Sequence, residues 1–184
     1  MVVATPPAPA STPTLPAAGG PPSTCKLCLV GMPGVGRTSL LQRLLHDRFP
    51  APPASPGITV ATHRWPHERD APTLMLWDVA GSSAIDSLNQ AFLSRIDGIA
   101  AVAALDQALS VERALQLVLQ IRRLYPGTPA TLLLNKSDLA ARAATVPVGA
   151  ADITSHEVSA RDGRGVQAAF LELARRAARV RVCA

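Results

Sequence analysis

Residues 31–38, which read Gly-Met-Pro-Gly-Val-Gly-Arg-Thr, lie between a short apolar run and a segment whose leucines have helical spacing. They match the phosphate-binding pattern G-x-x-x-x-G-K-[ST] at every fixed position except Arg37, which replaces lysine. Glycines let backbone N–H groups turn toward a phosphate, and a following helix directs its positive end there. A glycine-rich turn of this kind can also be purely structural. Arginine keeps the positive charge, but its longer, planar side chain changes the geometry.

Apolar runs and amphipathic segments alternate along the chain on both sides of this loop. The runs typical of buried strands are residues 26–30, 73–77, 99–105 and 130–134. Helical spacing covers residues 38–47, 111–124 and 166–180. This alternation predicts an α/β fold, a doubly wound and mostly parallel sheet with helices on both faces. Residues 143–153 have a loop-like pattern instead of the pattern of a full helix, so the sequence does not define the edge of the sheet.

The first 24 residues differ from the rest of the chain. They carry no charged side chain and seven prolines, a composition typical of a disordered tail that is partly polyproline II. A tail of this kind can dock on SH3-like partners, although a solvated tail is the favoured interpretation. We therefore expect a tail over residues 1–24 and one globular domain over residues 25–184.

The composition excludes several function classes. The net charge of +5 comes almost entirely from arginine, without a basic stripe interleaved with aromatics, so no nucleic-acid partner is expected. Neither an apolar run of about 20 residues nor a secretory signal is present, which predicts a cytoplasmic location. Cys25 and Cys28 are three residues apart in a predicted strand and point to opposite faces, which favours apolar packing over a zinc or redox site.

A second motif, Asn135-Lys136-Ser137-Asp138, follows the apolar run at residues 130–134. A carboxylate such as Asp138 can accept hydrogen bonds from both N1–H and the exocyclic amino group of guanine. Adenine has an acceptor at N1 and no amino group beside it, so a buried carboxylate there would stay unpaired. The motif therefore favours guanine over adenine, with a surface turn as the alternative.

Together these motifs resemble the Ras superfamily of small GTPases over residues 26–179, in the same order along the chain. Residues 77–81 (Trp-Asp-Val-Ala-Gly) resemble the family's W-D-x-A-G element, and Trp77 is typical of Rab- and Rho-like members. Residues 157–160 (Glu-Val-Ser-Ala) resemble its E-T-S-A segment, whose alanine amide meets the guanine O6. Phe49 has the spacing of the aromatic that packs against guanine, although a core aromatic at a helix end is an equal alternative.

The resemblance implies GTP/GDP and Mg²⁺ as cofactors. The residues that it assigns to the nucleotide are Gly31, Gly34, Val35, Gly36, Arg37, Thr38, Ser39, Phe49, Gly81, Asn135, Lys136, Asp138, Ser159 and Ala160. Those that it assigns to the metal are Thr38, Ser55 and Asp78. Asn135 is implied to tie neighbouring loops together, and the stem of Lys136 to lie along the purine.

Two departures from the family pattern concern catalysis. Ser82 stands where the family has a glutamine that orients the attacking water, and serine is too short for that task. Arg37 stands at the lysine position of the phosphate loop. Because phosphoryl transfer depends on electrostatics and orientation, we take Arg37 and Ser82 as the catalytic positions and predict slow GTP hydrolysis.

These observations predict a guanine-nucleotide switch with effectors, an exchange factor and an activating protein as partners. The first alternative is a pseudo-GTPase that serves as an interaction subunit, and the second is an ATP-using enzyme, which residues 135–138 disfavour. Cys183 is too near the end for prenylation and Val2 excludes myristoylation, so no lipid anchor is expected. The protein is expected to be a monomer.

Overall fold

The structure is a computed structural model that describes residues 24–50, 58–79, 96–140, 143 and 153–182. Six strands within these residues form one sheet in the order β2-β3-β1-β4-β5-β6. The strands are β1 (Thr24–Gly31), β2 (Ile58–His63), β3 (Thr73–Val79), β4 (Gly98–Ala104), β5 (Ala130–Asn135) and β6 (Thr154–Glu157). The described helices are α1 (Arg37–His46), α4 (Ala108–Leu124) and α5 (Val166–Val182).

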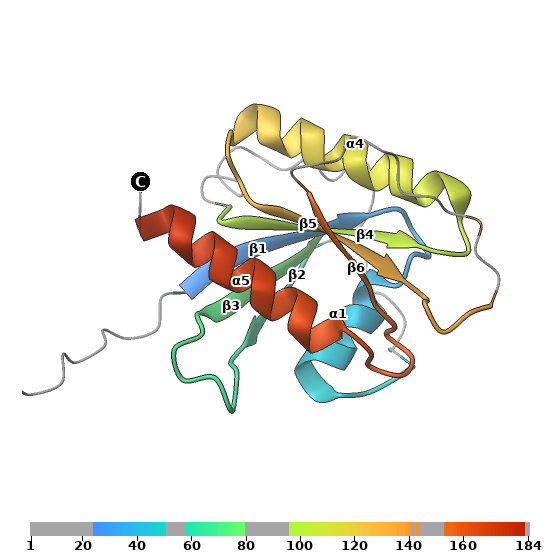
Figure 1. The fold of residues 1–184 in the computed structure, drawn as a ribbon, viewed down its shortest axis with the longest axis horizontal. Helices are drawn as coiled ribbons and strands as arrows, with labels where there is room; N and C mark the ends of the chain where they lie inside the picture. Colours follow the sequence, from blue (N-terminus) through green and yellow to red (C-terminus); the bar gives the residue numbers. More distant parts are fainter. Residues whose placement is uncertain (1–23, 51–57, 80–95, 141–142, 144–152, 183–184) are drawn as a thin grey trace, which may run out of the picture.

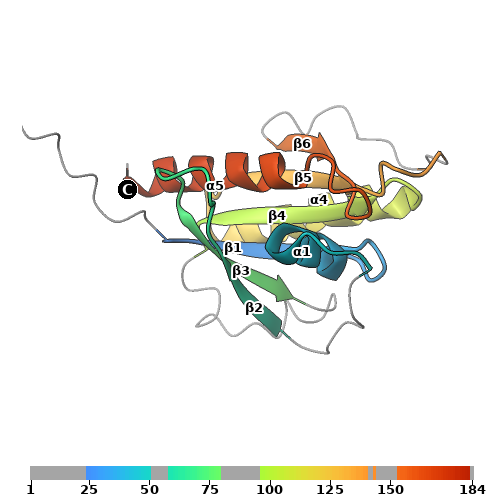
Figure 2. The same ribbon diagram turned by 90° about the horizontal axis from the view of Figure 1, so that it is seen from below.

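The sheet is parallel except at one edge, where β2 runs antiparallel to β3. Figure 1 shows α4 on the far side of the sheet from α1 and α5, and Figure 2 shows the same layers from below. The predicted doubly wound, mostly parallel sheet covered on both faces is confirmed.

Each face of the sheet has its own apolar core, because neighbouring residues in a strand point to opposite sides. Leu27 and Leu29 of β1 pack with Phe170 of α5 in the core beneath α1 and α5. Val30 of β1 packs with Val118 of α4 in the core on the other face. All seven residues of β4 are buried, as expected for a central strand covered on both faces.

The two cysteines near the start of β1 are apolar core residues. Cys25 belongs to the core beneath α1 and α5, and Cys28 to the core beneath α4. Both are buried free thiols, and burial raises the pKa of Cys28 to about 12. The prediction that they point to opposite faces is confirmed, and a thiol of such high pKa stays protonated and inert.

Two strands and the start of one helix differ from the sequence expectation. β2 and β6 lie at the two edges of the sheet and have no continuous apolar run. Their strand conformation comes from pairing with β3 and β5, which periodicity does not reveal. α4 begins at Ala108, three residues earlier than residues 111–124 predicted, and Ser110 bonds back to the end of β4.

Two predictions lie wholly or mostly outside the described residues, the tail over residues 1–24 and the loop over 143–153. Among the helices that the structure describes, none has the length and hydropathy needed to cross a bilayer.

Candidate functional site

The phosphate loop lies at the carboxyl end of β1, where the chain turns into α1 (Figure 1). Gly36 adopts a left-handed conformation with φ of 94°, and a Cβ atom there would collide with the Asn135 side-chain amide. Gly36 caps α1 without a side-chain hydrogen bond, and the first turn of the helix carries no acidic residue. The N–H groups at this end of α1 therefore suit an anion.

Arg37 points back under the loop, toward the sheet. Its Nη1 donates to the carbonyl oxygen of Gly31, and its Nε lies 3.2 Å from Oδ1 of Asp78 at the end of β3. The side chains of Arg37 and Asp78 are 10% and 7% exposed. The Nε–Oδ1 contact is ionic and lacks the alignment of a hydrogen bond, so Oδ1 keeps hydrogen-bonding capacity.

Thr38 completes this group, because its hydroxyl donates to Oδ2 of Asp78 at 3.2 Å. Burial raises the pKa of the Asp78 carboxyl above its usual value, while the Arg37 charge and the Thr38 hydrogen bond oppose the rise. Two of the three residues predicted as metal ligands, Thr38 and Asp78, therefore lie together. The third, Ser55, lies outside the described residues, as do Gly81 and Ser82.

Asn135 at the end of β5 joins three loops. Its side-chain amide donates to the carbonyl oxygen of Val35 at 2.8 Å, and its Oδ1 accepts from the backbone N–H of Ala160 at 3.1 Å. The residue is 2% exposed. These two bonds hold the phosphate loop, the segment after β5 and the segment after β6 in one fixed arrangement.

Lys136 has a left-handed backbone, with φ of 66°, and its Nζ lies 3.0 Å from Oδ2 of Asp106. Asp138 follows two residues later, and its Oδ1 accepts a hydrogen bond from the hydroxyl of Ser159 at 2.8 Å. Arg161 approaches Oδ2 of Asp138 to 3.7 Å. The hydrogen bond from Ser159 fixes the Asp138 carboxylate, and its second oxygen lies near a positive charge.

A cavity of about 440 Å³ lies between these segments. Its lining residues are Gly34, Gly36, Ser39, Phe49, Asn135, Lys136, Asp138, Leu139, Ala160 and Arg161. Phe49 is 45% exposed, so the alternative interpretation of it as a core aromatic is wrong. Residues from three separate motifs of the sequence, together with Phe49, therefore surround one cavity at the carboxyl edge of the parallel strands, where open α/β sheets bind ligands.

The comparisons with known proteins agree with this geometry. The family model described as "Ras family" matches residues 26–179, which is most of the chain. The chain belongs to the Ras family.

Among its relatives, Ras-related protein RabC of Dictyostelium discoideum is 32% identical over 155 residues, which cover 79% of this chain and 79% of RabC. Ypt/Rab-type GTPase Rab7 of Gibberella zeae is 30% identical, with 83% of this chain and 81% of that protein covered. EF-hand calcium-binding domain-containing protein 4B of Homo sapiens is 31% identical over 82% of this chain, which spans only 22% of that longer protein.

Membership of the Ras family makes the chain a nucleotide-binding switch of the small GTPase type, and it does not favour the pseudo-GTPase alternative. Sequence reasoning missed three residues of the site. Leu139 and Arg161 line the cavity. Each directly follows a motif residue, so their position next to Asp138 and Ala160 in the sequence could have indicated them. Asp106 is the partner of Lys136 but follows β4, and only the sheet order reveals that β4 and β5 are neighbours.

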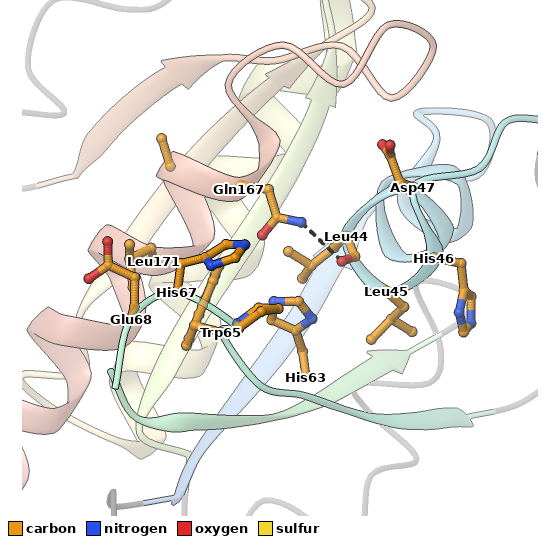
Figure 3. A pocket seen from close by; sticks show the side chains of 12 residues that line it. Leu44, Leu45, His46, Asp47, His63, Trp65, His67, Glu68, Gln167 and Leu171 are labelled. Carbon is orange, nitrogen blue, oxygen red and sulfur yellow. Dashed lines mark hydrogen bonds between the residues drawn. The ribbon is translucent and has the colours of Figure 1, made fainter. Parts of the chain in front are cut away.

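A second cavity of about 530 Å³ lies away from the motifs, between the end of α1, the β2–β3 connection and α5 (Figure 3). Gln167 of α5 donates to the carbonyl oxygen of Leu44 at 3.1 Å and so links the two helices there. The rings of His63 and Trp65 meet edge to face, with centroids 4.5 Å apart. Of the nucleotide and metal residues assigned from the sequence, those that the structure describes do not line this cavity.

Proposed function

We propose that this chain binds GDP and GTP in the 440 Å³ cavity and changes its partner preference with the nucleotide bound. The observation that carries the proposal is the single cavity that joins the glycines of the phosphate loop to Asn135, Lys136 and Asp138. The phosphates would lie at the N-terminus of α1 and the base at the segment after β5. The GTP-binding domain is proposed to cover residues 25–184.

Guanine selection is assigned to Asp138. Its carboxylate is held in place by Ser159 yet lines the cavity, so it can accept from the two guanine N–H groups. The Ala160 amide, expected to donate to the guanine O6, already donates to Asn135. Discrimination against adenine therefore depends more on Asp138 than the family pattern alone would suggest.

Mg²⁺ is proposed as the metal cofactor. The hydroxyl of Thr38 and the carboxylate of Asp78 are the hard oxygen donors that this ion prefers, and they lie 3.2 Å apart. When bound, the ion would neutralise phosphate charge. Thr38 and Asp78 themselves orient one another through their hydrogen bond.

GTP hydrolysis is proposed to be slow because Arg37 and Ser82 depart from the family pattern. The Arg37 guanidinium already donates a hydrogen bond to the Gly31 carbonyl oxygen and forms an ion pair with Asp78. Single-turnover measurements on the GTP-loaded protein test this, with Ser82→Gln expected to increase the rate roughly tenfold by supplying a side chain that can reach water. Hydrolysis as fast as in an ordinary Ras-like protein, unchanged in Ser82→Ala, would contradict the proposal.

The partners are proposed to be those of a switch, namely an effector, an exchange factor and an activating protein. The family relatives support such interactions in general. An activating protein could supply catalytic groups in trans, which would let a slow hydrolase return to its GDP state.

The experiment that tests binding is a titration of the purified protein against fluorescent GDP and GTP analogues, with unlabelled ATP as competitor. Saturable binding that GDP displaces and ATP does not is the expected result. Displacement by ATP and GDP at similar concentrations would contradict the assignment of Asp138. No binding at micromolar nucleotide would contradict the switch itself.

A further inference from the structure

Arg43 of α1 is a charged residue that lies beside the nucleotide cavity without lining it. Its side chain is only 14% exposed. A guanidinium so far removed from water needs hydrogen-bond acceptors within the protein. The structure supplies them in two places, at the end of α1 and in the segment that follows β6.

The acceptors at the end of α1 belong to Asp47. Nη1 of Arg43 donates to the carbonyl oxygen of Asp47 at 3.0 Å and to its carboxylate at 2.8 Å. The Asp47 side chain is 86% exposed, so water screens this ion pair and it contributes little stability. The two bonds engage one side of the guanidinium and leave Nε and Nη2 for other acceptors.

The acceptors after β6 are two consecutive backbone carbonyl oxygens. Nε of Arg43 donates to the carbonyl oxygen of Ala160 at 2.9 Å, and Nη2 donates to that of Arg161. Both Ala160 and Arg161 line the nucleotide cavity. A planar guanidinium suits two neighbouring acceptors, whereas the ammonium of lysine has no such fixed fork. Arg43 therefore links α1 to a segment of the cavity wall.

The same segment is also bonded to the residues assigned to the base. The backbone N–H of Ala160 donates to Asn135, so both backbone polar groups of Ala160 are engaged. The neighbouring hydroxyl of Ser159 donates to the carboxylate of Asp138 at 2.8 Å. Residues 159–161 therefore connect the Arg43 guanidinium to the Asp138 carboxylate through hydrogen bonds and three residues of backbone.

We propose that Arg43 is a positioning residue for guanine selection. Because it holds the carbonyl groups of residues 160 and 161, it keeps Ser159 where its hydroxyl orients the Asp138 carboxylate. The inference rests on the proposed function and adds to it a residue outside the cavity lining. Without the guanidinium, residues 159–161 lose two of their anchors, and Asp138 is less well preorganised for the base.

The test compares the affinities for GDP and inosine diphosphate, which lacks the exocyclic amino group of guanine. Both are measured unlabelled, as competitors of fluorescent GDP. In Arg43→Gln, the preference for GDP over inosine diphosphate is expected to fall by about fivefold or more, because a loosely held Asp138 gains less from the amino group. A merely structural role would weaken both nucleotides equally, since they share the ribose and phosphates. Equal weakening, or an unchanged preference, would overturn the inference.

Arg164→Gln is the matched control. Arg164 lies in the turn that follows the same segment, but its side chain is 64% exposed and pairs with Asp162. The same substitution there should change the preference by less than about twofold, because an exposed pair contributes little. A fall as large as that in Arg43→Gln would overturn the inference, since the loss of any arginine near this segment would then suffice.

Two further variants separate the contacts of Arg43. Arg43→Lys keeps the charge without the fork and serves if the glutamine variant does not fold. Its preference for GDP should fall by at least about twofold, and an unchanged preference would overturn the inference. Asp47→Asn removes the ion pair but leaves the carbonyl acceptors of residues 160 and 161, so it should keep the full preference. A loss equal to that in Arg43→Gln would assign the effect to Asp47 and overturn the inference.

The unmodified protein distinguishes this inference from the proposed function. If it binds GDP with micromolar affinity or better and Arg43→Gln keeps the same preference, only the role of Arg43 is overturned. If it binds no GDP in the titration described above, the proposed function is overturned and the role of Arg43 with it.

Discussion

Single side chains carry most of what the sequence predicts about this site. Asn135, Asp138 and Ala160 could be assigned from the motifs because each lies at or just after the end of a strand, and parallel strands bring such ends to one edge. The partner of Arg37 could not be assigned in this way. The direction of a long side chain depends on which acceptor, Gly31 or Asp78, the fold places within its reach.

Asp138 should dominate the choice of base. Asp138→Asn replaces one carboxylate acceptor by an amide N–H group that faces the guanine donors, so GDP affinity is expected to fall by about 100-fold or more. The measurement is the titration with fluorescent GDP. Asp47→Asn is the matched control, because Asp47 is exposed at the end of α1 and lies outside the nucleotide cavity. Equal affinities in the two variants would contradict the assignment.

His63 should make the stability of the protein depend on pH. Burial lowers the pKa of His63, and a hydrogen bond with Gln167 opposes this only in part. The unfolded state therefore binds a proton more readily than the folded state. The contribution of His63 to the free energy of unfolding is fully present above about pH 6.5, the pKa of histidine in the unfolded chain. It is lost as the pH falls below that value. Urea unfolding should therefore show a free energy of unfolding that falls between pH 7.5 and 5.5 because of this residue.

The variant His63→Gln should remove that part of the pH dependence, whereas His67→Gln should not, because His67 is exposed. If the free energy of unfolding of His63→Gln depended on pH as strongly as that of the unmodified protein, another group would be responsible.

At the level of elements, helices and central strands were predictable and edge strands were not. The apolar runs that become β4 and β5 are buried on both faces, and those that become β1 and β3 are mostly or half buried, so apolar composition alone identifies all four. β2 exposes Ile58 and Val60, so its side chains show no clean inside-outside pattern. Its register is set by β3, where Val60 lies opposite Trp77.

The turn that starts α5 should tolerate substitution poorly. Gly165 has φ of 72°, and a Cβ atom there would lie 2.8 Å from the carbonyl oxygen of Glu157 in β6. Gly127 has φ of 75° with no atom within 4 Å of the same position. Gly127→Ala should therefore cost about 1 kcal/mol from backbone strain alone, and Gly165→Ala at least about 2 kcal/mol. Chemical unfolding of both variants measures the difference. Equal losses in the free energy of unfolding would contradict a steric clash between Cβ at position 165 and the Glu157 carbonyl oxygen.

For the whole molecule, one ligand site connects segments far apart in the sequence. The cavity takes residues from the turn after β1, the segment after β5 and the turn after β6. Motif order predicted this convergence, because the sheet brings the carboxyl ends of parallel strands together. The sequence did not predict the second cavity between α1, the β2–β3 connection and α5, since it depends on how α5 packs against the edge hairpin.

Because bound nucleotide connects these segments, it should stabilise the protein against global unfolding. GDP at 100 times its own dissociation constant should add about 2.7 kcal/mol and raise the melting temperature by roughly 5–10 °C. The same concentration of ATP should produce little shift. Differential scanning fluorimetry checks both. An equal rise in melting temperature with ATP would contradict guanine selectivity. If GDP at a concentration that saturates the titration gave no rise, the proposal that bound nucleotide connects these segments would be contradicted.

The central position of β1 in the sheet has a consequence for synthesis of the chain. Among the described strands β1 is synthesised first, yet its two neighbours are β3 and β4, and β4 begins only at Gly98. At about 5–20 residues per second, the apolar strand ending at Gly31 waits on the order of 3–13 seconds for its second partner to be made. Throughout that interval an apolar segment with unpaired backbone groups is open to chaperones or to other nascent chains.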